Sequence, residues 1–391
     1  MGLLYLAVQA VLAPAAIVYP DTARYAAASL EYDGASPVAA HQAAVDLQCA
    51  DVAAQLARAD AVRPVPQHPD VTAAETACKT SQADHLMPTG SPRYQALFDA
   101  RPGYPLAAAF LAPLLGLKAA LWVIPVVSTF LAGVLVWVLL RQLGATPAAA
   151  AAGQALLYVL PTGWWGSQML TEGPVLLGVT AAVLGGVLCL AGRHGRGSLV
   201  LLAGLGITGL VKYSTATLVA AAVVAAVLVG GWRDTNRRGA LTAATIAAAV
   251  GGLLFWMTQT HRLPGSNETL QDMLTGHFAS PDVPDPIRML IDTDIHYWTA
   301  WLTLAPMNLA LIAGSVVAAY VLWRVWKPAM WLVGAVALVG IAAAAAHPDP
   351  FEFDRLYNNF RGVIPVDARA NVLRSADRHA AWTSGANDHL T

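Results

Sequence analysis

The chain alternates between long apolar runs and polar connections, and the apolar runs determine the predicted architecture. A helix of about 20 apolar residues crosses the hydrocarbon core of a bilayer, and many runs in this sequence approach or reach that length. We therefore predict an all-α polytopic membrane protein with nine transmembrane helices. The predicted spans are 2–19, 119–140, 148–161, 173–191, 198–213, 214–231, 239–257, 297–323 and 329–346.

Some apolar stretches are too short for a simple crossing. The spans 148–161 and 198–213 are short for a core of about 30 Å, so they tilt little, thin the bilayer or border a cavity. The stretch 104–117 is interrupted by Pro113 and is predicted to be a helix at the membrane surface. Residues 1–346 then form a transmembrane domain, and residues 347–391 form a polar tail.

Basic residues indicate which connections face the cytoplasm, because cytoplasmic loops are enriched in Lys and Arg. In this chain they gather at alternate turns, which predicts a cytoplasmic N-terminus in the plasma (inner) membrane. The segment 20–102, the loop 258–296 and the tail 347–391 are then extracytoplasmic. The basic residues are Arg141, Arg193, Arg196, Arg233, Arg237, Arg238, Arg324 and Lys327.

Composition excludes two broad classes of protein. Hydrophobic residues make up 57% of the chain and charged residues 12%, against about 25% charged residues in soluble domains. A water-soluble globule is therefore excluded. The formal net charge of −1 provides no positive field for a nucleic-acid backbone, so nucleic-acid binding is not expected.

Two features of the outer segment concern processing and redox state. Cys49 and Cys78 both lie in the segment 20–102, where an oxidising environment favours a disulfide, although two free thiols remain an alternative. The first span has an alternative interpretation as a cleaved signal peptide, because 13–15 (Ala-Pro-Ala) resembles a processing site. The absence of a basic n-region disfavours cleavage.

Candidate chemistry begins where the first span meets the outer surface. Asp21 and Tyr25 follow the span directly. A carboxylate at the boundary of water and hydrocarbon is partly desolvated, which strengthens it as a base for an acceptor hydroxyl. The alternative is an ordinary polar residue at the end of a helix.

A candidate phosphate ligand closes the outer segment. Arg101, Pro102, Gly103, Tyr104 and Pro105 stand directly before the surface helix. The planar guanidinium of Arg suits bidentate binding of a phosphate. The alternative is that Arg101 contacts anionic lipids in general.

Three more charged residues are candidates on the predicted outer side. Glu172 opens a span, where it either faces a cavity or stabilises the helix start with Thr171. Lys212 interrupts an apolar stretch, where it either binds phosphate or reaches toward the interface. Arg361 lies in the tail and is interpreted as a cation that faces the same cavity, or simply as a tail charge. Spacing in the tail matches no strong metal signature.

This constellation resembles the GT-C superfamily of membrane glycosyltransferases, which includes protein O-mannosyltransferases and lipid A aminoarabinose transferases. The resemblance rests on Asp21 with Tyr25, on the turn 101–105, and on Thr171 with Glu172, and it covers about the first half of the chain. The sequence departs from the family where Thr22 replaces a second acid. It also departs where 357–365 runs into a polar tail instead of further helices.

The resemblance implies a polyprenyl-phosphate sugar donor and transfer on the outer face to a lipid, glycan or protein acceptor. Asp21 takes the role of general base, Glu172 a supporting role and Arg101 the donor phosphate, with Lys212 or Arg361 assisting. An inverting displacement with no obligatory metal is expected. Two alternatives remain: a transporter or channel, disfavoured because few ionisable residues interrupt the spans, and a non-catalytic membrane scaffold.

Overall fold

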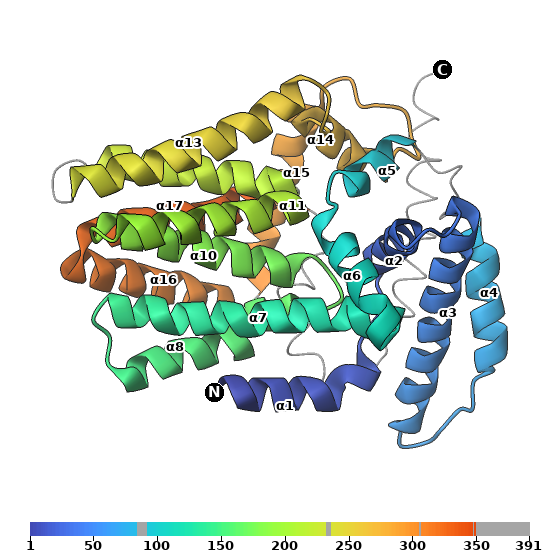
Figure 1. Ribbon diagram of the computed structural model, residues 1–391. Coiled ribbons are helices and arrows are strands. Elements are labelled where there is room, and N and C mark those ends of the chain that lie inside the picture. The colour runs from blue at the N-terminus through green and yellow to red at the C-terminus, as the bar shows by residue number, and fades with distance from the viewer. Residues whose placement is uncertain (84–91, 232–235, 305, 347, 349–391) are drawn as a thin grey trace.

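Every regular element in the described residues is helical, which confirms the predicted all-α class. The computed structural model describes residues 1–83, 92–231, 236–304, 306–346 and 348. The helices, shown in Figure 1, are α1 (Gly2–Leu12), η1 (Ala13–Ala15), α2 (Pro20–Tyr32), α3 (Pro37–Ala61), α4 (Val71–Ala83), α5 (Pro92–Asp99), α6 (Gly103–Leu115), α7 (Leu117–Gln142), α8 (Pro147–Val159), α9 (Pro161–Gly166), α10 (Glu172–Leu190), α11 (His194–Ala226), η2 (Val227–Gly231), α13 (Arg237–Gln259), α14 (Ser266–Leu274), α15 (Pro286–Leu304), α16 (Pro306–Val325) and α17 (Lys327–Ala345).

Several helices have the length and composition of membrane spans, so the chain is a multi-pass helical protein. Within the described ranges, five helical stretches are long and apolar enough to cross: α7, α10, α11 with η2, α13 and α17. A sixth is counted if α1–η1 and α2, which meet at 90°, form one broken span. The predicted number of nine is therefore not confirmed. Helices α6 and α8 and the part 312–325 of α16 are apolar but shorter.

The first predicted span, 2–19, is too long. Helix α1 ends at Leu12, the η1 turn follows, and the chain bends before α2 begins at Pro20. Proline explains both breaks: Pro14 lacks the N–H that a continuing helix requires, and Tyr19 before Pro20 is extended. The bend sends α2 away from the apolar bundle.

The predicted spans 198–213 and 214–231 lie on α11 and η2, which double back at Lys212. The backbone of Lys212 is not helical (φ −155°, ψ 79°). A straight helix over the 37 residues from His194 to Gly230 would be about 55 Å long. The five peptide units from 231 to 236 reach at most about 18 Å, yet Asn236 Nδ2 lies 3.3 Å from His194 Nε2. The two halves are therefore antiparallel.

Three other predicted segments differ in part from the helices of the structure. The predicted span 297–323 is not confirmed as one helix, since its described residues belong to α15 and α16. The predicted span 148–161 ends early at Val159, since Leu160 before Pro161 is extended. Most of the stretch 104–117 forms the helix α6, which ends at Leu115 before Gly116, where φ is 80°.

The main apolar core surrounds α10, which is buried along most of its length. Buried side chains of α10, α11, α13 and α17 form one cluster. Glycines permit the close approach of α10 and α11: a Cβ at Gly185 would lie 2.3 Å from Leu201 N, and one at Gly204 would lie 2.4 Å from Ala182 N. Side chains at these positions would force the two helices apart.

The two long polar segments, 20–102 and 258–296, lie at the same end of the bundle. Arg93 Nε of α5 donates to Glu268 Oε2 of α14 at 2.7 Å, and Arg93 Nη1 donates to Asp282 Oδ1 at 2.8 Å. Figure 1 shows α2–α5 together at the right, beyond the ends of the long helices. This agrees with the prediction that both segments face the same side.

The basic turns lie at the other end. Arg193 Nη1, between α10 and α11, donates to Gln142 Oε1 at the end of α7 at 2.8 Å. The contact of His194 with Asn236 brings the start of α13 to the same place. The alternation of basic and polar turns along the sequence thus corresponds to two opposite ends of the bundle (Figure 1).

A disulfide joins Cys49 of α3 to Cys78 of α4, as the sequence analysis predicted. The bond closes a loop across 29 positions, which by the chain-entropy argument contributes on the order of 3 kcal/mol. The α3–α4 pair is therefore covalently fixed beside α2.

Replacing both cysteines, C49S/C78S, is expected to lower the free energy of unfolding by about 3 kcal/mol. The change in midpoint of thermal or denaturant unfolding measures this loss, and faster migration of the non-reduced wild type on a denaturing gel reports the bond. The buried Cys189 provides the control, because C189S removes a thiol without opening a loop. An unchanged midpoint for C49S/C78S would contradict the expectation.

Candidate active site

The first turn of α2 is fastened to the chain segment that precedes α10. The hydroxyl of the fully buried Thr22 accepts the N–H of Tyr19 at 3.1 Å and donates to the carbonyl of Met169 at 2.7 Å. The Tyr19 hydroxyl also reaches Gln168 Oε1 at 3.5 Å. Asp21, next to Thr22, is therefore held near the residues that lead directly to Glu172.

Glu172 is the first residue of α10, and close backbone packing fixes its position. A Cβ at Gly173 would lie 2.2 Å from the carbonyl oxygen of Gly166 and 2.6 Å from that of Pro125. Thr129 Oγ1 of α7 donates to the Gly166 carbonyl at 2.5 Å. The start of α10 is thus pressed against α9 and α7 in a way that only glycine permits.

Arg101 stands in the turn between α5 and α6. Its N–H donates to the Phe98 carbonyl at 2.9 Å, and its guanidinium carbon lies 5.6 Å from the centre of the Phe98 ring. Two residues later, a Cβ at Gly103 would lie 3.1 Å from the carbonyl oxygen of Leu210. The Arg101 turn therefore lies beside the part of α11 that doubles back at Lys212.

Two buried tyrosines line the space between these elements. Tyr25 of α2 makes edge contacts with Phe98 and Tyr104, with ring centres 5.6 and 5.1 Å apart. Tyr104 donates its hydroxyl to the Leu121 carbonyl at 2.6 Å. Both side chains are 1% exposed, so Tyr25 forms a rigid wall between α2, α5 and α6.

The predicted charged residues act together on the Tyr25 hydroxyl. Burial raises the pKa of Tyr25; Arg101 opposes this rise, and the carboxylates of Asp21 and Glu172 add to it. Burial lowers the pKa of Arg101, but Tyr25, Asp21 and Tyr213 outweigh burial and raise it above the ordinary value. Burial also raises the pKa of Tyr104, with Tyr25 and Glu172 contributing. Asp21, Arg101 and Glu172 thus all lie close enough to Tyr25 to influence the pKa of its hydroxyl, and Tyr104 contacts its ring.

The two remaining predicted cations have different outcomes. Lys212 lies at the break in α11, and the neighbouring Tyr213 donates its hydroxyl to the Pro264 carbonyl at 2.6 Å. The backbone of Lys212 is therefore at the end of the bundle that carries the candidate site. Arg361 lies outside the described residues, as does nearly all of the predicted tail.

Arg24 of α2 is a further arginine at the candidate site, and the sequence analysis did not identify it. Its guanidinium carbon lies 4.1 Å from the ring centre of Tyr94 and 5.1 Å from that of Phe98. Phe98 thus contacts both Arg24 and Arg101. The spacing of three residues from Asp21 on α2 is the signal that points to Arg24, since residues at this spacing are neighbours on a helix.

The second outer segment completes this surface through His277. Its imidazole stacks on Tyr94 with ring centres 4.3 Å apart, and its Nδ1 lies 2.9 Å from Asp272 Oδ1. Tyr94 is therefore held between Arg24 and His277. No sequence pattern predicts the contact of His277 with Tyr94, because the two residues are about 180 positions apart and meet only in the folded chain.

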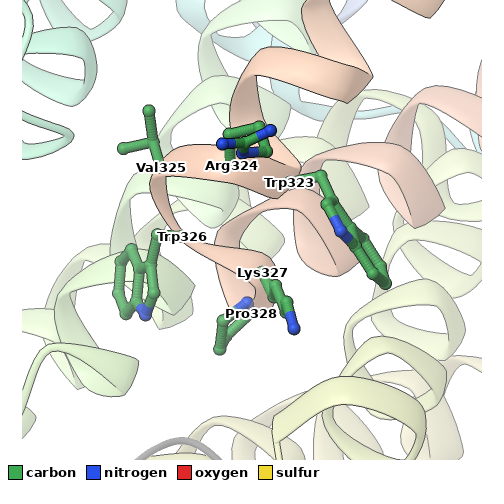
Figure 2. A pocket seen from close by; sticks show the side chains of 6 residues that line it. All are labelled: Trp323, Arg324, Val325, Trp326, Lys327 and Pro328. Carbon is green, nitrogen blue, oxygen red and sulfur yellow. The ribbon is translucent and has the colours of Figure 1, made fainter.

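One cavity borders the candidate site, and another lies at the turn from α16 to α17. Of these two, the larger, about 270 Å³, is formed by the six consecutive residues of that turn (Figure 2). The other, about 210 Å³, lies between α6, α7, α10 and α11 and has a mostly apolar lining, which includes Tyr104, Ile124, Pro174, Leu210 and Val211. We assign the candidate site to the second location, because its lining residues Gly103, Pro174 and Val211 stand within two positions of Arg101, Glu172 and Lys212 in the sequence.

Neither a metal nor a relative identifies the site. Within the described ranges, no group of three or more His, Cys, Asp or Glu residues is placed to hold a metal ion. Comparisons of the chain with family models, curated proteins and solved structures find no match. The interpretation of the site therefore rests on its own residues.

The contact of His277 with Asp272 is expected to weaken as the pH rises. The hydrogen bond that His277 Nδ1 donates to Asp272 Oδ1 raises the pKa of His277 above its ordinary value of 6.5, against the lowering effects of burial and Arg24, and Asp21 adds to the rise. Because the folded chain holds this proton more tightly, the contact stabilises fully below pH 6.5 and is lost as the pH rises through the folded pKa.

Hydrogen exchange over residues 266–283 measures this effect. Protection factors are compared, because they correct for the pH dependence of the intrinsic exchange rate. Protection is expected to fall as the pH rises from below to above the folded pKa, and D272N is expected to remove the pH dependence. H296Q is the control, because the His296 imidazole contacts only the Asp292 carbonyl among described hydrogen-bond partners. Equal pH dependence in D272N and wild type would contradict the interpretation.

Proposed function

We propose that the chain is a GT-C-type membrane glycosyltransferase that moves a sugar from a polyprenyl-phosphate donor to an acceptor hydroxyl. One observation carries the proposal: three distant parts of the sequence, which contain Asp21, Arg101 and Glu172, come together at one end of the bundle. The bond from Thr22 to Met169 joins the first turn of α2 to the segment before Glu172, and Phe98 contacts both Tyr25 of α2 and Arg101. A carboxylate base and a fixed cation in one site are what transfer from a phosphate leaving group requires.

In the proposed reaction, Asp21 accepts the proton of the acceptor hydroxyl. The acceptor oxygen forms a bond to the anomeric carbon as the bond from this carbon to the phosphate oxygen breaks, so the configuration inverts. The electron pair leaves with polyprenyl phosphate, and the proton stays on Asp21 until solvent removes it. Glu172, at the start of α10, positions the acceptor or the base.

Arg101 is the proposed ligand of the donor phosphate. Its Nε atom is buried, and no hydrogen-bond acceptor within the described residues lies in reach of it. A buried donor without a partner is costly, and a phosphate oxygen would remove that cost. Arg24 is a second candidate, because it shares Phe98 with Arg101. Lys212 keeps an assisting role, as does Arg361.

The neutralisation of the leaving phosphate by guanidinium groups means that the proposal requires no metal. Preorganised cations in a water-poor site stabilise developing negative charge strongly. The apolar cavity beside Tyr104 and Val211 supports a lipid-linked substrate, since its lining includes Gly103 in the turn that carries Arg101. Sugar, acceptor class and prenyl length are left open by the proposal.

The proposal places the site on the extracytoplasmic face of the plasma (inner) membrane. Support comes from the disulfide of Cys49 and Cys78 on the site end, which suits an oxidising compartment. Further support comes from the basic turns at the other end, near Arg193 and Arg237. The N-terminus is then cytoplasmic.

Asp21→Asn is expected to lower turnover by about 100- to 10,000-fold, because an amide cannot accept the proton. The assay uses the full chain in lipid nanodiscs, a panel of radiolabelled polyprenyl-phosphate pentoses and hexoses, and a membrane extract as the source of acceptors. D33N, at the end of the same helix, is the matched control. Full turnover by D21N would remove Asp21 from the mechanism.

Arg101→Gln is expected to weaken binding of polyprenyl phosphate while leaving binding of the uncharged polyprenol unchanged. Native mass spectrometry of the nanodisc complex measures both ligands. Arg63, a half-buried residue of the loop after α3, provides the control R63Q. Equal affinity of R101Q and wild type for polyprenyl phosphate would favour the scaffold or transporter alternatives.

Labelling with a membrane-impermeant thiol reagent tests the orientation. V62C, in the exposed loop after α3, is expected to react in intact cells. A148C, near the start of α8 at the basic end, is expected to react only after the membrane is opened. The opposite pattern would place the site on the cytoplasmic face.

A further inference from the structure

Asp51 of α3 is a buried carboxylate outside the charged group described above, and its bonds join three elements. Its side chain is 1% exposed. It accepts the N–H of Val18 at 2.9 Å and the amide of Gln55 at 2.7 Å on one oxygen, and Lys118 Nζ at 2.9 Å on the other. A buried carboxylate persists only when such partners compensate for lost water.

Val18 belongs to the connector 16–19, where the chain turns by 90° from η1 into α2. Helix α3 also holds η1, which precedes the connector, because Arg58 Nη1 donates to the Pro14 carbonyl at 3.3 Å. Lys118 comes from the start of α7. Asp51 therefore ties the bend to the rigid end of the long helix.

Asp21 lies three residues beyond the bond from Val18 to Asp51. Its direction is set on one side by this bond and on the other by the bond from Thr22 to Met169. If the first were lost, the connector before α2 would lose the bond that fixes its direction, and the first turn of α2 would depend on the bond from Thr22 to Met169. Misplacement of a reacting group by about 1 Å costs about 100-fold in rate.

We propose that Asp51 is a positioning residue for Asp21, acting through the Val18 N–H and the ion pair with Lys118 to aim the first turn of α2 into the site. The inference rests on the proposed function, because it assigns to Asp51 the alignment of the proposed base. Asp51 itself touches neither donor nor acceptor.

The same helix offers a matched control in Asp60. This carboxylate is also buried, and it accepts the N–H groups of Gln67 at 2.8 Å and His68 at 3.0 Å. Its partners lie in the loop that follows α3, and none of its described bonds reaches the connector. Loss of Asp60 therefore loosens the outer segment without releasing α2.

Hydrogen exchange of the full chain in nanodiscs is the first test. D51A is expected to increase exchange over residues 13–25 with little change over 60–70, and D60A is expected to do the reverse. K118M is a milder second variant, since Lys118 is 37% exposed, and it should increase exchange over 13–25 to a smaller extent. Unchanged exchange over 13–25 in both D51A and K118M would overturn the proposal.

Kinetics in the transfer assay is the second test. D51A is expected to lower kcat by about 10- to 100-fold while KM for the donor stays constant, and D60A is expected to leave both unchanged. D51N should recover part of the loss, because its amide oxygen can still accept the Val18 N–H. Equal kcat for D51A and D60A in an active preparation overturns the positioning role alone. Equal turnover by D21N and wild type instead overturns the proposed function.

Discussion

The hydrogen bond from the buried Thr22 hydroxyl to the Met169 carbonyl is the contact on which the candidate site depends. It joins α2, which follows the first apolar helix, to the irregular segment before α10, 147 positions further along the chain. Without it, Asp21 and Glu172 would belong to unrelated surfaces. The same Thr22 hydroxyl also accepts the N–H of Tyr19, which gives this backbone donor at the start of α2 a hydrogen-bond partner.

Close packing of glycines within the helical bundle fixes the start of α10, next to the bond from Thr22 to Met169. Glycines at 173, 185 and 204 let α10 approach α7, α9 and α11 at distances that no side chain would tolerate. In an apolar environment such approach is a principal source of helix association, because hydrophobic burial gives little preference for one apolar neighbour over another. The rigid bundle then presents its irregular end, with Arg101, Glu172 and the break at Lys212, to the outer segments.

The outer segments carry most of the polar contacts, and they are built as two layers. Helices α2 and α3 are joined to the bundle through Asp51, Lys118 and Thr22, whereas α14 is joined to α5 through Arg93 and the stack of His277 on Tyr94. The inner layer is buried and the outer layer is half-exposed. The outer layer is therefore expected to open first when the chain loosens.

Much of this organisation was predictable from the sequence, because it depends on local properties. Apolar length predicted helices and a membrane, and cysteine position predicted the bond between Cys49 and Cys78. Charged residues next to apolar runs led to the hypothesis that Asp21, Arg101 and Glu172 form a group. The number of spans was not predictable, because helices end before Pro14 and before Pro161 within apolar runs that hydropathy alone treats as suitable for crossing. Lys212, which interrupts an apolar run, lies at the sharp turn of α11.

The amino-acid sequence by itself determined the class of protein, the helical elements and the kinds of chemical group available, since these follow from composition and from neighbours within a few positions. Only the tertiary structure decided which groups meet: that Arg24 and Arg101 share Phe98, that His277 closes over Tyr94, and that Asp51 holds the bend before Asp21. These contacts join residues tens to hundreds of positions apart. Their partners are selected by packing of the whole chain, which no local pattern records.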